Sequence, residues 1–424
     1  MKLSSILKTK TLRQSSITLF GTLVSGIVGA ISYIWVARLL GPVDYGVFAV
    51  AIATMGLLAS VSNVGTDTGI IRFVGKYWTH EPGKALKFMK LGFLVKVTVW
   101  VMVLLFGWIF IPVLSNSFLG KPELLVPLRI SLLGVGGTLL FSFVCAGNQA
   151  IGRFAVWSGL MIFSNILRIV LIGALVYLMI FDLYGSLWIF ILMPLAAFLG
   201  GVLLLPRFLG SGETSSVRSE FFGYNKWVAA FTILTAISSR LDTYLAVRFL
   251  SLELVGVYSV AVTLAAFVSQ FTLAIATVVA PKLSGMDKDE DAWNYLVKLQ
   301  GLVVVLGFIG GVAGLVAGYF LIPVLYGPQY SGSFTPFVFL LLSQVVFFMA
   351  IPAHTAAMYY FSYPKLFVLV GVVYLFVVGF LGWVLISSYG VVGAGLSMLV
   401  AQCFNFLIPF VWVFGKFRSR RMLQ

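Results

Sequence analysis

Long apolar runs alternate with short polar segments along the whole chain. A helix needs about 20 residues to cross a bilayer core of ~30 Å, and each run has roughly that length. Twelve runs qualify, at residues 15–39, 44–65, 88–113, 126–147, 154–179, 184–206, 226–249, 255–280, 298–323, 334–355, 364–386 and 391–414. The pattern therefore predicts an all-α integral membrane protein with twelve transmembrane helices.

Basic residues are concentrated between the apolar runs rather than within them. An even number of spans places both termini on the same side of the membrane. Both terminal segments are basic, and every loop predicted on their side carries at least one lysine or arginine, whereas the opposite loops are short and poor in both. Since positively charged loops stay in the cytoplasm, both termini are predicted to be cytoplasmic.

Composition excludes a water-soluble globule, because the chain is 61% hydrophobic and only 10% charged, with a mean hydropathy of +1.07. Its net charge of +15 does not indicate nucleic-acid binding, since the cations form bands between the spans. Cys145 and Cys403 lie inside apolar runs and are interpreted as small core residues. His80 and His354 lie far apart without a neighbouring nucleophile or ligand cluster, so neither an enzyme nor a metal site is predicted.

The second half of the chain repeats the first, because residues 37–51 align with residues 247–261. The aligned motif residues are Arg38 with Arg248 and Gly46 with Gly256. Repeats with an even number of spans insert in the same orientation, which predicts a parallel repeat with a pseudo-two-fold axis along the membrane normal. We therefore predict two six-helix lobes around a central cavity, with an N-lobe at residues 1–206, a cytoplasmic linker at 207–225 and a C-lobe at 226–424.

Four ionisable residues lie well inside the predicted spans, and a charge at mid-membrane costs roughly 2.5–3.5 kcal/mol. Arg168, Arg240 and Asp242 are predicted near the bilayer centre, and Lys96 lies closer to the cytoplasmic side. These charges either lock helices together as ion pairs or bind an anionic substrate, and Lys96 could also snorkel to the cytoplasmic surface. Arg240 and Asp242 are not expected to pair, because residues two apart on a helix point in nearly opposite directions.

Three segments carry a family resemblance: Asp242 with Leu250, Val255-Gly256-Val257-Tyr258 and Ala261; Ala37-Arg38-Leu39-Leu40-Gly41-Pro42 with Tyr45-Gly46; and Tyr389-Gly390-Val391-Val392-Gly393-Ala394-Gly395. They resemble polysaccharide flippases of the Wzx type, which belong to the multidrug/oligosaccharidyl-lipid/polysaccharide (MOP) exporter superfamily. The resemblance covers nearly the whole chain, including the helix count and the internal repeat. It implies a MATE-like fold and a multi-pass transporter of the plasma (inner) membrane.

The resemblance also implies an activity, the translocation of an undecaprenyl- or dolichyl-diphosphate-linked oligosaccharide from the cytoplasmic to the outer leaflet by alternating access, for cell-surface polysaccharide biosynthesis. Arg168, Arg240 and Lys96 would then be the cations that bind the substrate. Asp242 would couple transport to protons or sodium, or form a gate. No cofactor is implied, and the expected partners are the lipid-linked oligosaccharide, membrane lipids, and a glycan polymerase or glycosyltransferases.

Three other functions are weighed against the flippase. An ion-coupled multidrug or organic-cation antiporter of the same superfamily needs carboxylates in its binding lobe, yet Asp44, Asp67 and Asp182 all lie at predicted helix ends. A flippase for the lipid-linked peptidoglycan precursor is expected to have two further C-terminal helices. A membrane-embedded glycosyltransferase or polymerase predicts a large outer loop or an acidic catalytic motif, and the sequence has neither.

Overall fold

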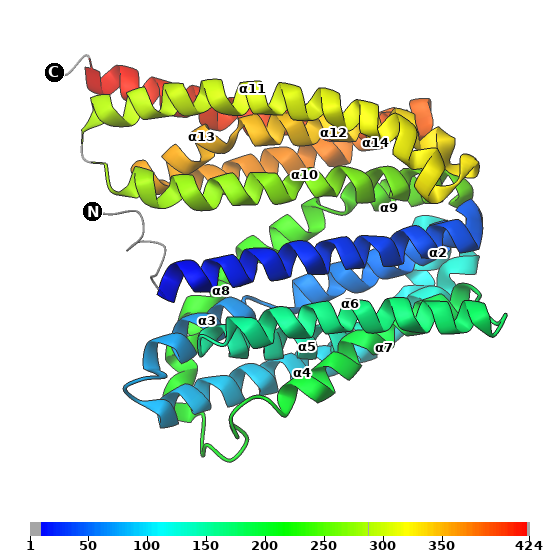
Figure 1. The fold of residues 1–424 in the computed structure, drawn as a ribbon, viewed down its shortest axis with the longest axis horizontal. Helices are drawn as coiled ribbons and strands as arrows, with labels where there is room; N and C mark the ends of the chain where they lie inside the picture. Colours follow the sequence, from blue (N-terminus) through cyan, green and yellow to red (C-terminus); the bar gives the residue numbers. More distant parts are fainter. Residues whose placement is uncertain (1–9, 287, 422–424) are drawn as a thin grey trace. The chain divides into compact units, whose positions relative to one another are not determined.

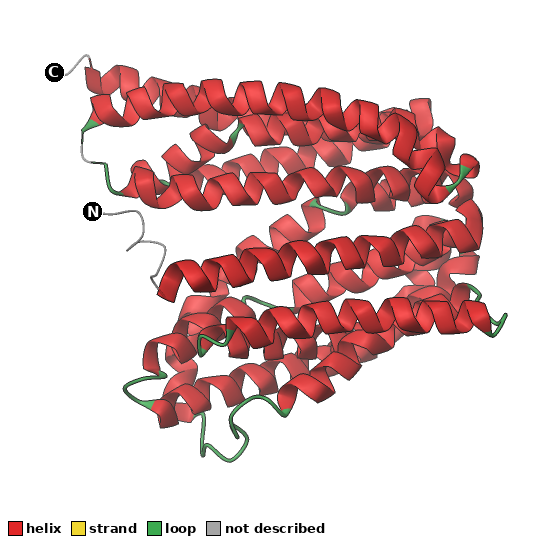
Figure 2. Cartoon of the chain, in the orientation of Figure 1, coloured by secondary structure: helices red, strands yellow, loops and turns green. Residues whose placement is uncertain are grey.

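The computed structural model describes residues 10–286 and 288–421. These residues are almost entirely helical, and none of them lies in a β-strand (Figure 2). The elements, in chain order, are α2 (Lys10–Ser62), α3 (Thr66–Tyr77), α4 (Pro82–Pro112), η1 (Val113–Leu119), η2 (Pro122–Leu124), α5 (Leu125–Ala150), α6 (Phe154–Tyr177), α7 (Leu183–Val202), α8 (Ser215–Ser238), α9 (Leu241–Phe249), α10 (Leu252–Ser284), α11 (Asp289–Leu321), η3 (Ile322–Tyr326), η4 (Pro328–Ser333), α12 (Phe334–Met349), α13 (Ile351–Thr355), η5 (Ala356–Tyr360) and α14 (Lys365–Arg421) (Figure 1).

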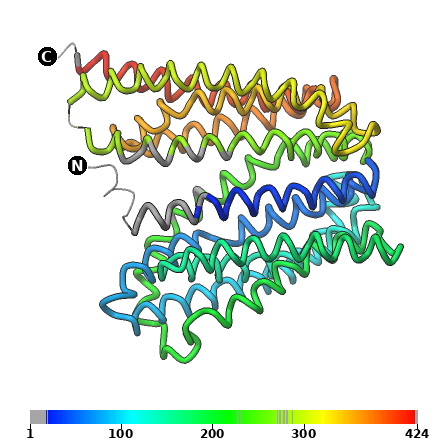
Figure 3. Tube along the Cα trace, in the orientation of Figure 1, coloured from blue at the N-terminus to red at the C-terminus, as the bar shows by residue number. Residues whose placement is uncertain are grey.

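Nine helices in the described part of the chain are long and apolar enough to cross a membrane. Two of these, α2 and α14, are each kinked at a glycine with positive φ, 76° at Gly41 and 60° at Gly390, so each supplies two spans. The seventh predicted span consists of α8 and α9 together, separated by a turn at Ser239 and Arg240 (Figure 3). The twelve-helix, all-α layout predicted from the apolar runs is therefore confirmed.

The chain divides into two compact units, of which unit 1 contains Met1–Leu40 and Val47–Ala236. Part of its core lies among α3, α4, α5 and α8, where each helix contributes a buried phenylalanine. Phe73 of α3 and Phe88 of α4 stack with their ring centroids 4.8 Å apart, and Phe221 of α8 lies 6.2 Å from both. Aromatic packing thus joins helices that are distant in sequence, since such pairs add to the free energy gained from burial.

Unit 2 contains Gly41–Gly46 and Ile237–Gln424. Its largest core cluster joins α10, α11, α12 and α14 through buried aliphatic and aromatic side chains. At the start of α11, Asp289 accepts hydrogen bonds from the hydroxyl of Tyr360 and, at 2.9 Å, from the guanidinium of Arg420. Burial and the bond to Asp289 raise the pKa of Tyr360, which lies beyond the tenth span, to about 12. Tyr360 therefore keeps its proton at neutral pH and remains a donor.

The polar segment after the second span is not a simple loop. The span ends at Ser62, and Val64 and Gly65 then adopt positive φ angles of 40° and 74°. A β-branched residue rarely adopts such an angle, so Val64 marks a strained break in the chain. Beyond the break, α3 buries Ile70, Phe73 and Val74 on one face, which the search for uniformly apolar runs could not detect because α3 is amphipathic.

The segment predicted as a cytoplasmic linker, residues 207–225, packs within unit 1. It becomes helical at Ser215, the first residue of α8, and Phe208, Val217 and Phe221 are all buried. Two glycines let α3 approach α8 closely, because a Cβ added at Gly69 would lie 2.5 Å from Oδ1 of Asn225. At Gly65, an added Cβ would lie 2.9 Å from the Val228 side chain. Apart from Gly41–Gly46, the chain enters unit 2 after Ala236, beyond the predicted linker.

Candidate functional site

Lys96 of α4 belongs to a polar cluster inside unit 1. It has no exposed surface, and its Nζ lies 2.8 Å from Oδ1 of Asp67. The same amine donates hydrogen bonds to Oγ of Ser142 at 2.7 Å and to Oδ1 of Asn63 at 3.3 Å. The ammonium is thus neutralised by a carboxylate and does not snorkel to the surface. Contact between Lys96 and a substrate would require this ion pair to open.

Asp67 was not among the residues that the sequence singled out for a role, because it follows the end of an apolar run. The amide of Asn63 holds the carboxylate on its other side, donating from Nδ2 to Oδ2 of Asp67 at 2.7 Å. In return, the backbone N–H of Asp67 donates to Oδ1 of Asn63 at 3.2 Å. The pair therefore bridges the break at Val64 and Gly65, and Lys96 ties that break to α4 and α5.

Arg168 of α6 presents a different environment in the same unit. Its guanidinium stacks on the ring of Phe190 of α7, 4.1 Å from the centroid, and its Nη1 donates to Oδ1 of Asn165 at 3.1 Å. Asn165 is itself fixed, since its Nδ2 donates to Oγ of Ser25 at 2.8 Å. Among the described residues no carboxylate forms an ion pair with Arg168, and its Nε is buried without a hydrogen-bond partner.

This arrangement fixes the orientation of the Arg168 guanidinium. The aromatic ring and the amide hold the guanidinium plane in place, whereas its positive charge is left uncompensated within the described part of unit 1. A guanidinium carries five donors in a rigid fork that matches the oxygens of a phosphate. The depth of Arg168 was predicted from sequence, but the stacking on Phe190 joins residues 22 positions apart and has no local sequence signal.

Arg240 and Asp242 flank the break in the seventh span, in unit 2. Arg240 precedes the first residue of α9 and is half-buried, whereas Asp242 is 2% exposed. No ion pair joins the two side chains in the part of the chain that the structure describes. Instead, the hydroxyl of Tyr258 donates to Oδ2 of Asp242 at 2.6 Å, and Oδ1 is buried without a hydrogen-bond partner.

The unpartnered oxygen of Asp242 suits a small positive species. A buried carboxylate oxygen that lacks a donor is costly, and a proton or a cation would remove that cost. Among the described residues no group of three or more His, Cys, Asp or Glu side chains could hold a metal ion. A single carboxylate with a tyrosine hydroxyl can bind a proton with no other ligand, whereas sodium would need additional oxygens.

The repeat motif forms a symmetrical close contact within unit 2. A Cβ added at Gly46 would lie 2.0 Å from the backbone oxygen of Leu252, and one added at Gly256 would lie 2.0 Å from that of Pro42. The repeat has an offset of 210 residues, so Gly46 corresponds to Gly256 and Pro42 corresponds to Leu252. The contact of Gly46 with Leu252 is therefore the counterpart of the contact of Gly256 with Pro42. The glycines therefore allow the two copies of the motif to cross backbone against backbone.

The two arginines of the motif have a different environment from its glycines. Arg38 and Arg248 are both exposed, and they lie close to the outer ends predicted for the first and seventh spans. Since both side chains are exposed, packing does not explain why arginine occurs at positions 38 and 248. The glycines, in contrast, have a clear packing reason, since any larger side chain would collide with a carbonyl group.

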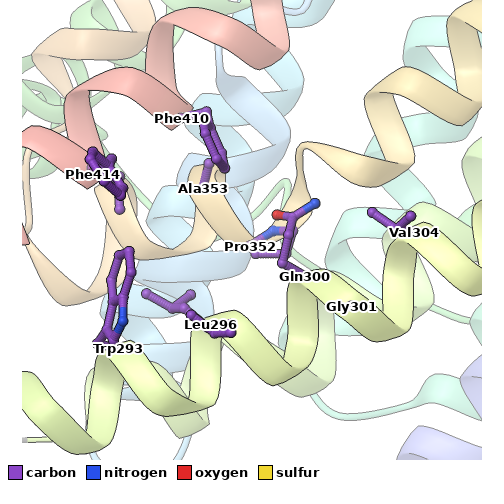
Figure 4. Close-up of a pocket in the computed structure, with 11 residues that line it drawn as sticks. Trp293, Leu296, Gln300, Gly301, Val304, Pro352, Ala353, Phe410 and Phe414 are labelled. Carbon is purple, nitrogen blue, oxygen red and sulfur yellow. The ribbon is translucent and has the colours of Figure 1, made fainter.

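Unit 2 also contains an apolar groove of about 400 Å³, formed by α11, α13 and α14 (Figure 4). Trp293, Phe410 and Phe414 line one part of it, and Pro352 and Gln300 another. The amide of Gln300 donates to the backbone oxygen of Met349 at 3.1 Å. None of the residues that line this groove is charged, so it offers no site for an anionic head group.

A family model described as "Polysaccharide biosynthesis protein" matches residues 35–335 of the chain. No curated protein matches the sequence. Solved transporter structures do match the fold. An inward-facing multidrug resistance MATE family transporter of the MOP superfamily shares 14% identity at a TM-score of 0.73, covering 98% of this chain and 99% of that one.

Two further structures extend the fold comparison. The lipid II flippase MurJ, in an inward closed conformation, shares 16% identity at a TM-score of 0.66, covering 93% of this chain and 87% of that one. A MOP superfamily transporter from Pyrococcus furiosus shares 15% identity at a TM-score of 0.62, covering 96% and 95%. Identities this low show the fold, which is MATE-like as the resemblance implied.

Proposed function

The chain belongs to the polysaccharide biosynthesis protein family, and from this membership and its transporter fold we propose that it is a flippase for a lipid-diphosphate-linked oligosaccharide. The substrate enters from the cytoplasmic leaflet and leaves in the outer leaflet by alternating access, with an undecaprenyl or dolichyl chain remaining in the lipid. The protein resides in the plasma (inner) membrane with both termini in the cytoplasm, and it works with the glycosyltransferases or polymerase that supply or extend the glycan.

The observation that carries this proposal is the uncompensated charge of Arg168. A guanidinium that is fixed by Phe190 and Asn165, with a buried and unpartnered Nε, is a costly feature unless it meets an anion. The diphosphate of a lipid-linked sugar supplies such an anion, because its oxygens accept charge-assisted hydrogen bonds from the guanidinium. In the proposed function Arg240 of unit 2, which has no ion-pair partner among the described residues, is a further cation for binding the anionic substrate.

Asp242 couples this movement to an ion in the proposed mechanism. Its buried Oδ1 takes up a proton or a sodium ion, while Tyr258 holds Oδ2. Binding of the ion removes a negative charge from the interior of unit 2 and so changes the relative free energies of the transport states. A gradient of that ion then drives substrate movement in one direction.

The same carboxylate favours a second candidate function, an ion-coupled antiporter of drugs or organic cations, since such a substrate would bind to an unpaired acid. Asp67 does not serve in this way while it is paired with Lys96. Arg168 argues against this function, because a fixed and uncompensated cation repels an organic cation. Transport assays that offer both kinds of substrate separate the two functions.

Purified protein in vesicles provides the test. A fluorescent oligosaccharide linked to a polyprenyl diphosphate is placed in both leaflets, and an impermeant quencher added outside reports its exchange between leaflets. The unaltered protein should accelerate this exchange without forming new bonds, and Arg168→Gln should slow it by at least about tenfold, the loss of one charged hydrogen bond. Arg218→Gln is the matched control, because Arg218 is an exposed arginine of the same unit.

Two results would contradict the proposal. Exchange at the unaltered rate in Arg168→Gln would remove Arg168 from the substrate site. Efflux of an organic cation by the unaltered protein, with no movement of the lipid-linked sugar, would establish the antiporter instead.

A further inference from the structure

Arg129 is a cation on the apolar outer surface of unit 1. It is the fifth residue of α5, whose exposed positions nearby are Val126 and Leu133, 50% and 40% exposed. Residues spaced by three, four and seven positions share one face of a helix, so Arg129 lies on the same face as these two side chains. Exposed apolar side chains of a membrane-spanning helix contact lipid, which places Arg129 at the lipid boundary.

The side chain of Arg129 lies against a single aromatic partner. Its guanidinium stacks on the indole of Trp108 of α4, 4.7 Å from the ring centroid. Trp108 is 50% exposed, and its neighbours Leu105 and Ile109 are 63% and 69% exposed, so the partner also belongs to the lipid-facing surface. Tryptophan at such a position is typical of the interface between the acyl chains and the head groups.

Arg129 has no counter-ion within the described part of the chain, and its Nε is buried without a hydrogen-bond partner. The indole ring covers one face of the guanidinium but accepts no conventional hydrogen bond from it. An unpaired cation on a lipid-facing helix is costly unless it reaches a polar group of the bilayer. The missing partner must therefore be an acceptor that the membrane supplies.

Depth identifies that acceptor. Arg129 lies seven residues, about 10 Å, inside the apolar helical stretch Pro122–Ala150, and Trp108 lies eleven residues before the end of the stretch Pro82–Leu119. Both residues belong to the part of their spans nearest the connection between α4 and α5, and a long arginine side chain can extend from such a position to the lipid phosphates at that surface. We propose that Arg129, stacked on Trp108, binds the phosphate of a lipid in the leaflet at this end of unit 1.

The site offers one ligand chemistry from two sources. An ordinary anionic phospholipid presents one phosphate, and a polyprenyl diphosphate presents two. The second source rests on the proposed flippase function and on the predicted orientation, in which this end faces outward and the site would receive the translocated diphosphate. Binding itself depends on neither, because Arg129 recognises phosphate oxygens in both cases.

Lipid binding to the purified full-length protein in a phosphate-free detergent tests the site. Native mass spectrometry counts the bound molecules as phosphatidylglycerol or a sugar-free polyprenyl diphosphate is titrated in. Arg129→Gln should weaken binding of at least one of the two by about tenfold. Lys121→Gln serves as the matched control, since Lys121 is a cation in the same connection between α4 and α5.

The two arms have distinct outcomes. Weaker binding of both lipids by Arg129→Gln supports a general lipid-phosphate site, and weaker binding of the diphosphate alone supports a substrate site. Equal binding of both lipids by the unaltered protein and by Arg129→Gln would overturn the proposal and leave Arg129 as a membrane anchor. If Arg129→Gln does not fold, Arg129→Lys supplies the comparison, because it keeps the charge, loses the planar fork, and should bind several-fold more weakly.

Binding is measured without transport, so the two proposals fail in different ways. A protein that binds lipid phosphate through Arg129 but does not move the lipid-linked sugar retains this site and loses the flippase function. A protein that moves the sugar but binds both lipids equally with and without Arg129 retains the function and loses the site.

Discussion

In unit 1 the Asp67 carboxylate lies 2.8 Å from the ammonium of Lys96. In unit 2 the Asp242 carboxylate forms no ion pair with a described residue and accepts a hydrogen bond from the Tyr258 hydroxyl at 2.6 Å. Unit 1 also contains a cation, Arg168, that forms no ion pair with a carboxylate of a described residue. The uncompensated interior charge is therefore positive at Arg168 and negative at Asp242. This difference fits the proposed mechanism, in which Arg168 of the first unit binds an anion and Asp242 of the second binds a proton or cation.

The internal repeat shows how this difference is built on one scaffold. At the offset of 210 residues that relates Gly46 to Gly256, Ser32 corresponds to Asp242 and Phe48 to Tyr258. The first half thus lacks both the carboxylate and the hydroxyl that accompanies it. Phe48 instead packs against Phe190, with ring centroids 4.9 Å apart, and Phe190 carries Arg168 on its ring. The two halves therefore differ at both positions that form the Asp242–Tyr258 pair, and the first half adds Arg168.

The largest expected effect comes from breaking the pair in unit 1. Lys96→Met should lower the free energy of unfolding by about 3–5 kcal/mol, because it leaves Asp67 without its counter-ion. Thermal unfolding of the purified protein in detergent, followed by intrinsic fluorescence, measures the loss. The double variant with Asp67→Leu should recover most of it, since no unpaired charge remains.

Lys90→Met provides the control for that experiment, because Lys90 is half-buried on the same helix and its amine donates an exposed hydrogen bond to the backbone oxygen of Gly212. It should change stability by less than about 0.5 kcal/mol. A Lys96→Met protein as stable as this control would show that Asp67 needs no partner, and the contrast between the two carboxylates would disappear.

The second-largest effect is expected when Tyr258 of unit 2 is replaced by phenylalanine, the residue at the corresponding position 48 of unit 1. Tyr258→Phe removes the hydrogen bond from the tyrosine hydroxyl to Asp242 and should cost about 1.5–3 kcal/mol, the range for bonds to a charged group. Tyr319→Phe is the control, because Tyr319 is 61% exposed in the same unit. Equal unfolding temperatures for the two variants would mean that Asp242 does not depend on Tyr258.

A third effect concerns the close glycine contact that both copies of the repeat motif form. Gly46→Ala and Gly256→Ala should each cost about 1–3 kcal/mol, because the added Cβ would lie 2.0 Å from a backbone oxygen that cannot rotate away. Gly56→Ala should instead stabilise the protein by up to about 1 kcal/mol, since no atom lies within 4 Å of its added Cβ. Unfolding curves of the three variants in detergent test the repeat directly, and a large difference between the first two would disprove its symmetry.

Sequence patterns were sufficient for the features that depend on neighbours along the chain. The apolar runs predicted the spans, and both kinks, at Gly41 and Gly390, fall where a run was predicted to end. The amphipathic helix α3 was missed, because its apolar face is too narrow to form a run. Arg129 was overlooked because it lies only three residues inside the fourth predicted run.

The candidate site was predicted only in part, for a different physical reason. The depth of Arg168 and Asp242 follows from counting residues at a fixed rise along a helix. Their partners, Phe190 and Tyr258, are set by packing between helices, which no local pattern encodes. The pairing of Lys96 with Asp67 is the clearest case, because it joins two helices across the break at Val64 and Gly65 that the apolar pattern did not show.

The smallest effect on stability is also the one that best tests the comparison. Asp242→Asn should change the free energy of unfolding by less than about 1 kcal/mol, because the amide keeps an oxygen for Tyr258 while the uncompensated charge is lost. The same change in unit 1, Asp67→Asn, should cost about 3–5 kcal/mol, because Lys96 is then buried without a counter-ion. Asp242→Asn should nevertheless abolish the dependence of transport on an ion gradient, measured in vesicles with and without that gradient. Equal losses of stability in the two variants would show that the carboxylates of the two units are equivalent. Gradient-driven transport by Asp242→Asn would show that Asp242 does not couple transport to the ion.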